Sequence, residues 1–153
     1  MIITHTVPSA GRELTITRTL DATPDVVFEA WIEPERAREW MGPRGFRAVH
    51  LESDPRPGGK WRICLCDENG QELWQGGVYR EIVANERLVF TLAWDQKVRP
   101  GHETTVTVNF IPKGTRTSMT FQQGAFESMS ERDGHRAGWN STFDRLSEHV
   151  REA

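Results

Sequence analysis

Residues 128–150 read SMSERDGHRAGWNSTFDRLSEHV, and the architecture of the chain can be worked out from this stretch. Its apolar side chains recur at steps of three and four, which is the spacing of one helix face. Ser128 followed by Glu131 is the capping-box pattern that begins a helix. We therefore predict a long amphipathic helix over residues 128–151. Its apolar stripe consists of His135, Trp139, Phe143, Leu146 and Val150.

Two glycines, Gly134 and Gly138, interrupt this predicted helix. Each costs about 1 kcal/mol relative to alanine inside a helix. We expect close packing against a sheet, or a bend, to explain them. Gly138 directly precedes Trp139, so a close approach there would press that indole against the sheet.

Upstream of the helix the hydrophobic period changes to two, which indicates strands with one buried and one wetter face. Leu88, Phe90, Leu92 and Trp94 share a face in this way, and Asn69-Gly70 is typical of a hairpin turn. The segments predicted as strands are residues 12–19, 46–53, 60–66, 73–83, 87–94, 104–111 and 115–122.

Two short helices are predicted between the first strand and the second. Thr23-Pro24-Asp25 supplies a cap, a proline at the first helical position and an acid at the positive end of the helix dipole. The first helix runs to Ile32, Pro34 interrupts it, and the second covers residues 35–40. Gly42-Pro43 then ends the helical region.

This order of elements predicts an α+β fold, in which one curved antiparallel sheet of about seven strands wraps around the C-terminal helix. We find no internal repeat or linker, so residues 1–153 are expected to form a single domain. A helix about 10 Å across cannot fill the whole concavity of such a sheet. The remaining space is either packed with large side chains or left as a cavity.

Composition narrows the function classes. The chain has 153 residues, of which 37% are hydrophobic and 27% charged, so a packed core is expected rather than disorder. The net charge is -3 without a basic stripe, which disfavours nucleic-acid binding. There is no apolar run of ~20 residues and no signal peptide, so we expect a soluble cytoplasmic protein without membrane insertion.

Residues that ligate metals are not clustered in the sequence. Cys64 and Cys66 are two apart on a predicted strand, where they share a face and suit neither a mutual disulfide nor a zinc site. The other histidines show no ligand spacing; these are His5, His50, His102 and His149. We predict no metal and no cofactor.

Catalytic motifs are also missing, and no catalytic residue is assigned. The chain has no Gly-x-Ser-x-Gly elbow, and the Gly58-Gly59 pair lacks the rest of a phosphate loop. His135 is the best candidate for acid–base work because it lies on the inward stripe of the long helix. The alternative is a histidine that hydrogen-bonds a strand carbonyl or lies half-exposed near the start of the helix.

The six tryptophans are the most informative composition feature. They are explained either by a small core of large rings or by an aromatic pocket. If a cavity exists, strand alternation and the helix stripe predict its lining. The predicted lining residues are Trp61, Ile63, Trp74, Val78, Phe90, Leu92, Trp94, Val108, Met119, Phe121, His135 and Trp139.

Several segments together resemble the family of activators of heat-shock-protein-90 ATPase homologues. They are TPDVVFEAW at residues 23–31, DPRPGGKW at 54–61, GVYREI at 77–82, ERLVFT at 86–91, and His135-x-x-Gly138-Trp139. That family belongs to the START-like (SRPBCC) superfamily, whose helix-grip fold resembles that of the birch-pollen allergen. The resemblance implies a hydrophobic cavity under the long helix. Members of this superfamily include carriers of apolar ligands, enzymes, resistance proteins and chaperone activators.

Three functions follow as hypotheses. The leading one is a binding protein for a small apolar or aromatic molecule, held between the sheet and the C-terminal helix. The second is a cyclase- or hydrolase-like enzyme acting on a polyketide-like or aromatic substrate, which would need a buried acid–base pair. The third is an interaction module that serves the chaperone heat-shock protein 90 as a co-chaperone, which would need an exposed patch.

Overall fold

The computed structural model describes residues 11–95 and 103–151, so the predictions concerning His5 and His102 lie outside the described residues. The elements follow the predicted order, with bounds that agree to within two residues. They are β1 (Leu14–Leu20), α2 (Pro24–Ile32), α3 (Pro34–Trp40), β2 (Phe46–Ser53), β3 (Lys60–Asp67), β4 (Glu72–Val83), β5 (Arg87–Trp94), β6 (Thr104–Lys113), β7 (Arg116–Gly124) and α4 (Met129–Arg151).

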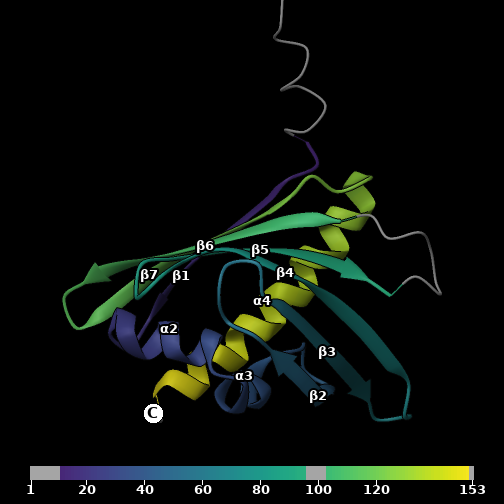
Figure 1. Ribbon diagram of the computed structural model, residues 1–153, viewed down its shortest axis with the longest axis horizontal. Coiled ribbons are helices and arrows are strands. Elements are labelled where there is room, and N and C mark those ends of the chain that lie inside the picture. Colours follow the sequence, from purple (N-terminus) through teal and green to yellow (C-terminus); the bar gives the residue numbers. More distant parts are fainter. Residues whose placement is uncertain (1–10, 96–102, 152–153) are drawn as a thin grey trace, which may run out of the picture.

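The strands form one antiparallel sheet in the order β1-β7-β6-β5-β4-β3-β2. Figure 1 shows the sheet curling around α4, with α2 and α3 on the same concave side as that helix. Register shifts between Ala48 and His50 and between Tyr79 and Glu81 interrupt two of the ladders. Such bulges bend a strand and increase its twist. The predicted α+β helix-grip fold is confirmed.

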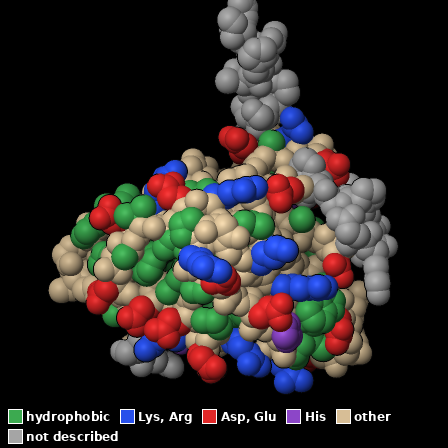
Figure 2. Space-filling view, viewed as in Figure 1, with side chains coloured by type: hydrophobic (Ala, Val, Ile, Leu, Met, Phe, Trp, Pro, Cys, Tyr) green, Lys and Arg blue, Asp and Glu red, His purple; other side chains and the backbone are tan. Residues whose placement is uncertain are grey.

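One face of the molecule is mixed in charge. On the face drawn in Figure 2, acidic and basic side chains alternate with polar and apolar ones and do not gather by sign. No helix in the part of the chain that the structure describes is both long and apolar enough to cross a membrane.

Aromatic rings fill most of the concavity. Trp31 of α2 lies 5.0 Å from Trp40 and 6.2 Å from Trp139, measured between ring centroids. Phe121 of β7 lies 4.6 Å from Trp139 and 5.2 Å from Phe143 in the same way. The rings therefore form one continuous cluster that joins α2, α3, the sheet and α4.

The break between α2 and α3 leaves a backbone carbonyl inside this cluster without its usual helical donor. The carbonyl of Ala30 would normally accept a bond from the amide of residue 34, but Pro34 has no N–H. The indole Nε1–H of Trp40 donates to that carbonyl at 3.0 Å instead, and Trp40 is fully buried. Pro34 and Trp40 thus fix the angle between the two short helices.

Helix α4 begins as predicted, because the backbone N–H of Glu131 donates to Ser128 Oγ at 3.1 Å. We expected close packing against the sheet to explain Gly134 and Gly138, and this prediction is wrong. A Cβ placed on Gly134 or Gly138 would meet nothing within 4 Å. These positions face open space.

Arg145 of α4 ties the end of α3 to the long helix. Its guanidinium donates to the carbonyls of Glu39, Gly42 and Phe46 at 3.2, 2.8 and 3.1 Å. The Glu39 carbonyl lies in the last turn of α3, where the helix dipole favours a positive charge. Burial lowers the pKa of Arg145 from its ordinary value, although arginine stays charged. Arg145 therefore holds the turn between α3 and β2 in place.

Replacing Arg145 with methionine removes the charge, keeps the apolar stem of the side chain, and should destabilise the fold. For Arg145→Met we expect a loss of about 2 kcal/mol in the free energy of unfolding, since hydrogen bonds to charged groups contribute ~1.5–3 kcal/mol each and water replaces some of them. Urea unfolding followed by circular dichroism measures the change. Arg151→Met, an exposed change on the same helix, is the control and should stay within about 0.5 kcal/mol of wild type. Equal stability of the two variants would contradict the assigned role.

Candidate functional site

Two adjoining cavities remain in the concavity after the aromatic rings have packed. We call the first the tryptophan cavity; it encloses about 50 Å³ and is lined by Trp31, Trp61 and Trp139 together with residues of α3, β2, β4 and β5. We call the second the glycine cavity; it measures about 260 Å³, is partly open to solvent, and is lined by Gly42, Gly134 and Gly138 together with residues of β2 to β5 and α4. Small-molecule sites typically measure ~300–1,000 Å³. Together the cavities approach the lower end of that range.

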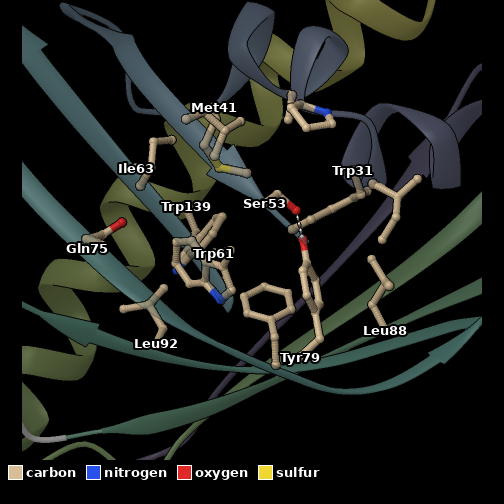
Figure 3. A pocket seen from close by; sticks show the side chains of 15 residues that line it. Trp31, Met41, Ser53, Trp61, Ile63, Gln75, Tyr79, Leu88, Leu92 and Trp139 are labelled. Carbon is tan, nitrogen blue, oxygen red and sulfur yellow. Dashed lines mark hydrogen bonds between the residues drawn. The ribbon is translucent and has the colours of Figure 1, made fainter. Parts of the chain in front are cut away.

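Three side chains border both cavities, namely Met41, Gln75 and Trp139. Figure 3 shows them among the side chains that line the tryptophan cavity, with the rings of Trp139 and Trp61 overlapping near the middle of the view and Gln75 to the left. The junction between the cavities is therefore one flexible thioether, one amide and one indole.

Trp139 is fixed at this junction by a buried chain of hydrogen bonds. Its Nε1–H donates to Gln123 Oε1 at 2.8 Å, and Gln123 Nε2–H donates to Thr104 Oγ1 at 2.9 Å. The Thr104 hydroxyl donates in turn to the Leu92 carbonyl at 3.2 Å. Gln123 is only 1% exposed and Thr104 only 4%. The chain links α4 to β7, β6 and β5.

The tryptophan cavity carries few polar groups, and all of them are uncharged. Ser53 and Tyr79 share a hydrogen bond between their hydroxyls at 3.1 Å, drawn as the dashed line in Figure 3. Burial raises the pKa of Tyr79, so its phenol stays protonated at neutral pH. The Nε1–H of Trp31 is buried and has no partner among the described residues. The other five indoles all donate within the protein.

His135 lies at the wall of the glycine cavity. Its Nε2 accepts a hydrogen bond from Trp94 Nε1–H at 3.1 Å, and its ring packs 4.8 Å from the ring of Phe126. Burial lowers the pKa of His135, and the nearby charge of Glu131 opposes that shift. The imidazole is therefore neutral at pH 7, with its proton on Nδ1. The partner is an indole on a strand and not the strand carbonyl considered as the alternative.

Seven of the twelve residues predicted to line a cavity do so in the structure. The tryptophan cavity contains Trp61, Ile63, Phe90, Leu92 and Trp139, and the glycine cavity contains Trp94, His135 and again Trp139. Three others point inward but are packed in the filled core, namely Val108, Met119 and Phe121, each 0% exposed. The concavity is thus open on the side of β3 to β5 and filled on the side of β6 and β7.

Trp74 and Val78 were placed on the wrong face of β4. The register pairs Gln75 with Trp94 and Tyr79 with Phe90, so the odd-numbered residues of this part of the strand face inward. Trp74 lies on the outer face, where the Arg62 guanidinium stands 4.5 Å from its ring centroid. A one-residue error in phase moves a whole strand to the opposite face.

The lining residues missed by the sequence come mainly from three places. Helices α2 and α3 and the turn after them contribute Trp31, Ile32, Pro34, Ala37, Met41, Gly42 and Pro43. Strand β2 contributes Phe46, Leu51 and Ser53, and β4 contributes Leu73, Gln75 and Tyr79. Phasing β4 from Tyr79 instead of Trp74 would have found the last group.

Neither a metal centre nor a catalytic pair is apparent in the described ranges. Residues 11–95 and 103–151 contain no group of three or more His, Cys, Asp or Glu side chains that could hold an ion. Cys64 and Cys66 are free thiols, with Cys64 buried. Among the described residues that line the two cavities, His135 is the one acid–base candidate, and no carboxylate lines either cavity.

A curled antiparallel sheet around a C-terminal helix, with a cavity beneath that helix, defines a helix-grip domain. The sequence profile of the family described as "Activator of Hsp90 ATPase homolog 1-like protein" matches residues 21–151. The chain belongs to this family, within the START-like superfamily, as the resemblance implied.

Solved structures support the same fold. A protein from Chromobacterium violaceum is 26% identical, with a TM-score of 0.84 over 91% of this chain and 96% of its own. A protein from Nitrosomonas europaea is 23% identical, with a TM-score of 0.80 over 94% of this chain and 96% of its own. The AHSA1 protein from Silicibacter pomeroyi is 20% identical, with a TM-score of 0.80 over 90% and 96%. A comparison with curated proteins gave no match.

The buried neutral state of His135 predicts a dependence of stability on pH. Because its pKa in the folded protein lies below the ordinary 6.5, the unfolded chain takes up this proton first as the pH falls. The contribution of His135 is therefore complete above pH 6.5 and is lost as the pH falls through that value toward the lower folded pKa.

His135→Gln keeps an acceptor for Trp94 and removes the titration. We expect the fall in unfolding free energy between about pH 7.5 and about pH 5.5 to be smaller in this variant than in wild type, as urea unfolding at each pH would measure. Identical pH dependence in the two proteins would show that His135 is not held neutral by the fold.

Proposed function

We propose that this protein binds a small apolar or aromatic molecule in the joined tryptophan and glycine cavities. The observation that carries the proposal is the open space along α4. Gly134 and Gly138 weaken a helix by about 1 kcal/mol each, yet a side chain there would clash with nothing. We infer that glycine is present at both positions because a larger side chain would fill the glycine cavity.

The composition of the walls supports an apolar ligand. Indole, phenyl and aliphatic groups make up most of both cavities, and such surfaces gain free energy when they lose contact with water. The few polar groups are placed at defined points, as in most small-molecule sites. Chaperone contact and enzymatic turnover gain no comparable support from the described residues.

Binding should be visible with uncharged probes. Titration with Nile red, and separately with the hydrocarbon diphenylhexatriene, should give saturable fluorescence changes with dissociation constants near 1 µM, or about 8 kcal/mol. Trp139→Ala should weaken dye binding and also cost ~3 kcal/mol of stability, because this half-buried indole packs against the core. Lack of saturation with every apolar probe below the unfolding temperature would leave a filled core as the better description.

Gly138→Leu separates binding from packing, which Trp139→Ala cannot do. Leucine is a strong helix former and its Cβ enters open space, so stability should rise by up to about 1 kcal/mol. The rest of the side chain occupies the glycine cavity, so dye affinity should fall at least about tenfold, equivalent to 1.4 kcal/mol. Thermal unfolding and the same dye titration measure both effects. Unchanged affinity in a stable variant would exclude the glycine cavity as the binding site.

A further inference from the structure

The polar groups of the cavity walls indicate which kind of molecule they accept. Among the described lining residues none carries a formal charge at neutral pH, since burial keeps both titratable rings, Tyr79 and His135, neutral. Burying a carboxylate or an ammonium group without a partner is costly. The walls therefore select against ions of either sign.

Gln75 is the polar group best placed to meet a ligand. It projects from the inner face of β4 at the junction of the two cavities. Its side-chain amide makes no hydrogen bond to the described residues, and the amide is not sealed from solvent. An amide offers two donors and one acceptor oxygen, so this side chain has unused capacity in both directions.

The second inward-facing glutamine shows the contrast. Gln123 has its oxygen occupied by Trp139 and its nitrogen by Thr104, and it is almost fully buried. Gln123 is a structural link, whereas Gln75 occupies a half-buried position with no such partner. A polar ligand group that enters the junction would meet the Gln75 amide in place of water.

We propose that the natural ligand is an uncharged ring compound with a carbonyl or hydroxyl group that hydrogen-bonds to the Gln75 amide. Its ring system occupies the glycine cavity, and its polar group lies at the junction, next to Trp139. The buried Nε1–H of Trp31 is a further unused neutral donor in the wall of the tryptophan cavity. This inference rests on the proposed function and adds the chemical class of the ligand.

Three naphthalene probes of similar size test the proposal by displacement of Nile red. They are 2-acetylnaphthalene with a carbonyl, 2-isopropenylnaphthalene without one, and the anion 2-naphthoate. Wild type should prefer the ketone over the hydrocarbon by about five- to tenfold, the range expected for one added hydrogen bond, and should bind the anion most weakly.

Gln75→Leu should abolish this preference, so that ketone and hydrocarbon bind within about twofold of each other. Arg80→Gln changes an exposed residue of the same strand that lines neither cavity, and it should keep the wild-type preference. Circular dichroism melts confirm that both variants are folded.

The possible failures are distinguishable. If both neutral probes compete equally well in wild type, or the preference survives in Gln75→Leu, recognition by Gln75 is wrong and binding of apolar molecules stands. If 2-naphthoate binds most tightly, the selection against charge is wrong. If Nile red itself does not saturate, the proposed function fails with it.

Discussion

A chain of hydrogen bonds from Trp139 through Gln123 and Thr104 to the Leu92 carbonyl ties α4 to three strands through the core. Polar groups inside a core are tolerated only when each finds its partner, so this chain permits very few arrangements of helix and sheet. Hydrophobic contact alone would let the helix slide or rotate in the concavity. With the Trp139 indole held in place, the rings of Trp31, Phe121 and Phe143 pack around it.

The fixed position of the Trp139 indole also determines where the cavities lie. Trp139 occupies the middle of the concavity, and the filled core lies on one side of it, against β6 and β7. On the other side α2 and α3 close the space, at an angle set by Pro34 and Trp40, and Arg145 fixes the turn that follows. The open volume is thus a consequence of rigid neighbours, and the two glycines of α4 keep it from being filled.

Most of the fold could be predicted from sequence because its signals are local. Hydrophobic period, caps and turn residues located the seven strands and three helices of the described residues. The site was harder, because strand β4 carries apolar residues on both faces and its phase was set wrongly from Trp74 and Val78. Only the pairing with β5 reveals that Gln75 and Tyr79 face inward. The contribution of α2 and α3 depends on long-range packing, which no short pattern encodes.

The pairing of β1 has a consequence for how the chain folds as it leaves the ribosome. Among the described strands, β1 pairs with β7 alone, from Leu14 opposite Gln123 to Leu20 opposite Thr117, so about a hundred residues separate the partners. Among the described strands β1 is synthesised first, so it lacks its partner until the other six have been made. Such distant pairing slows folding and exposes strand edges meanwhile. Helix α4 follows β7, so the cavities are incomplete until α4 packs against the sheet.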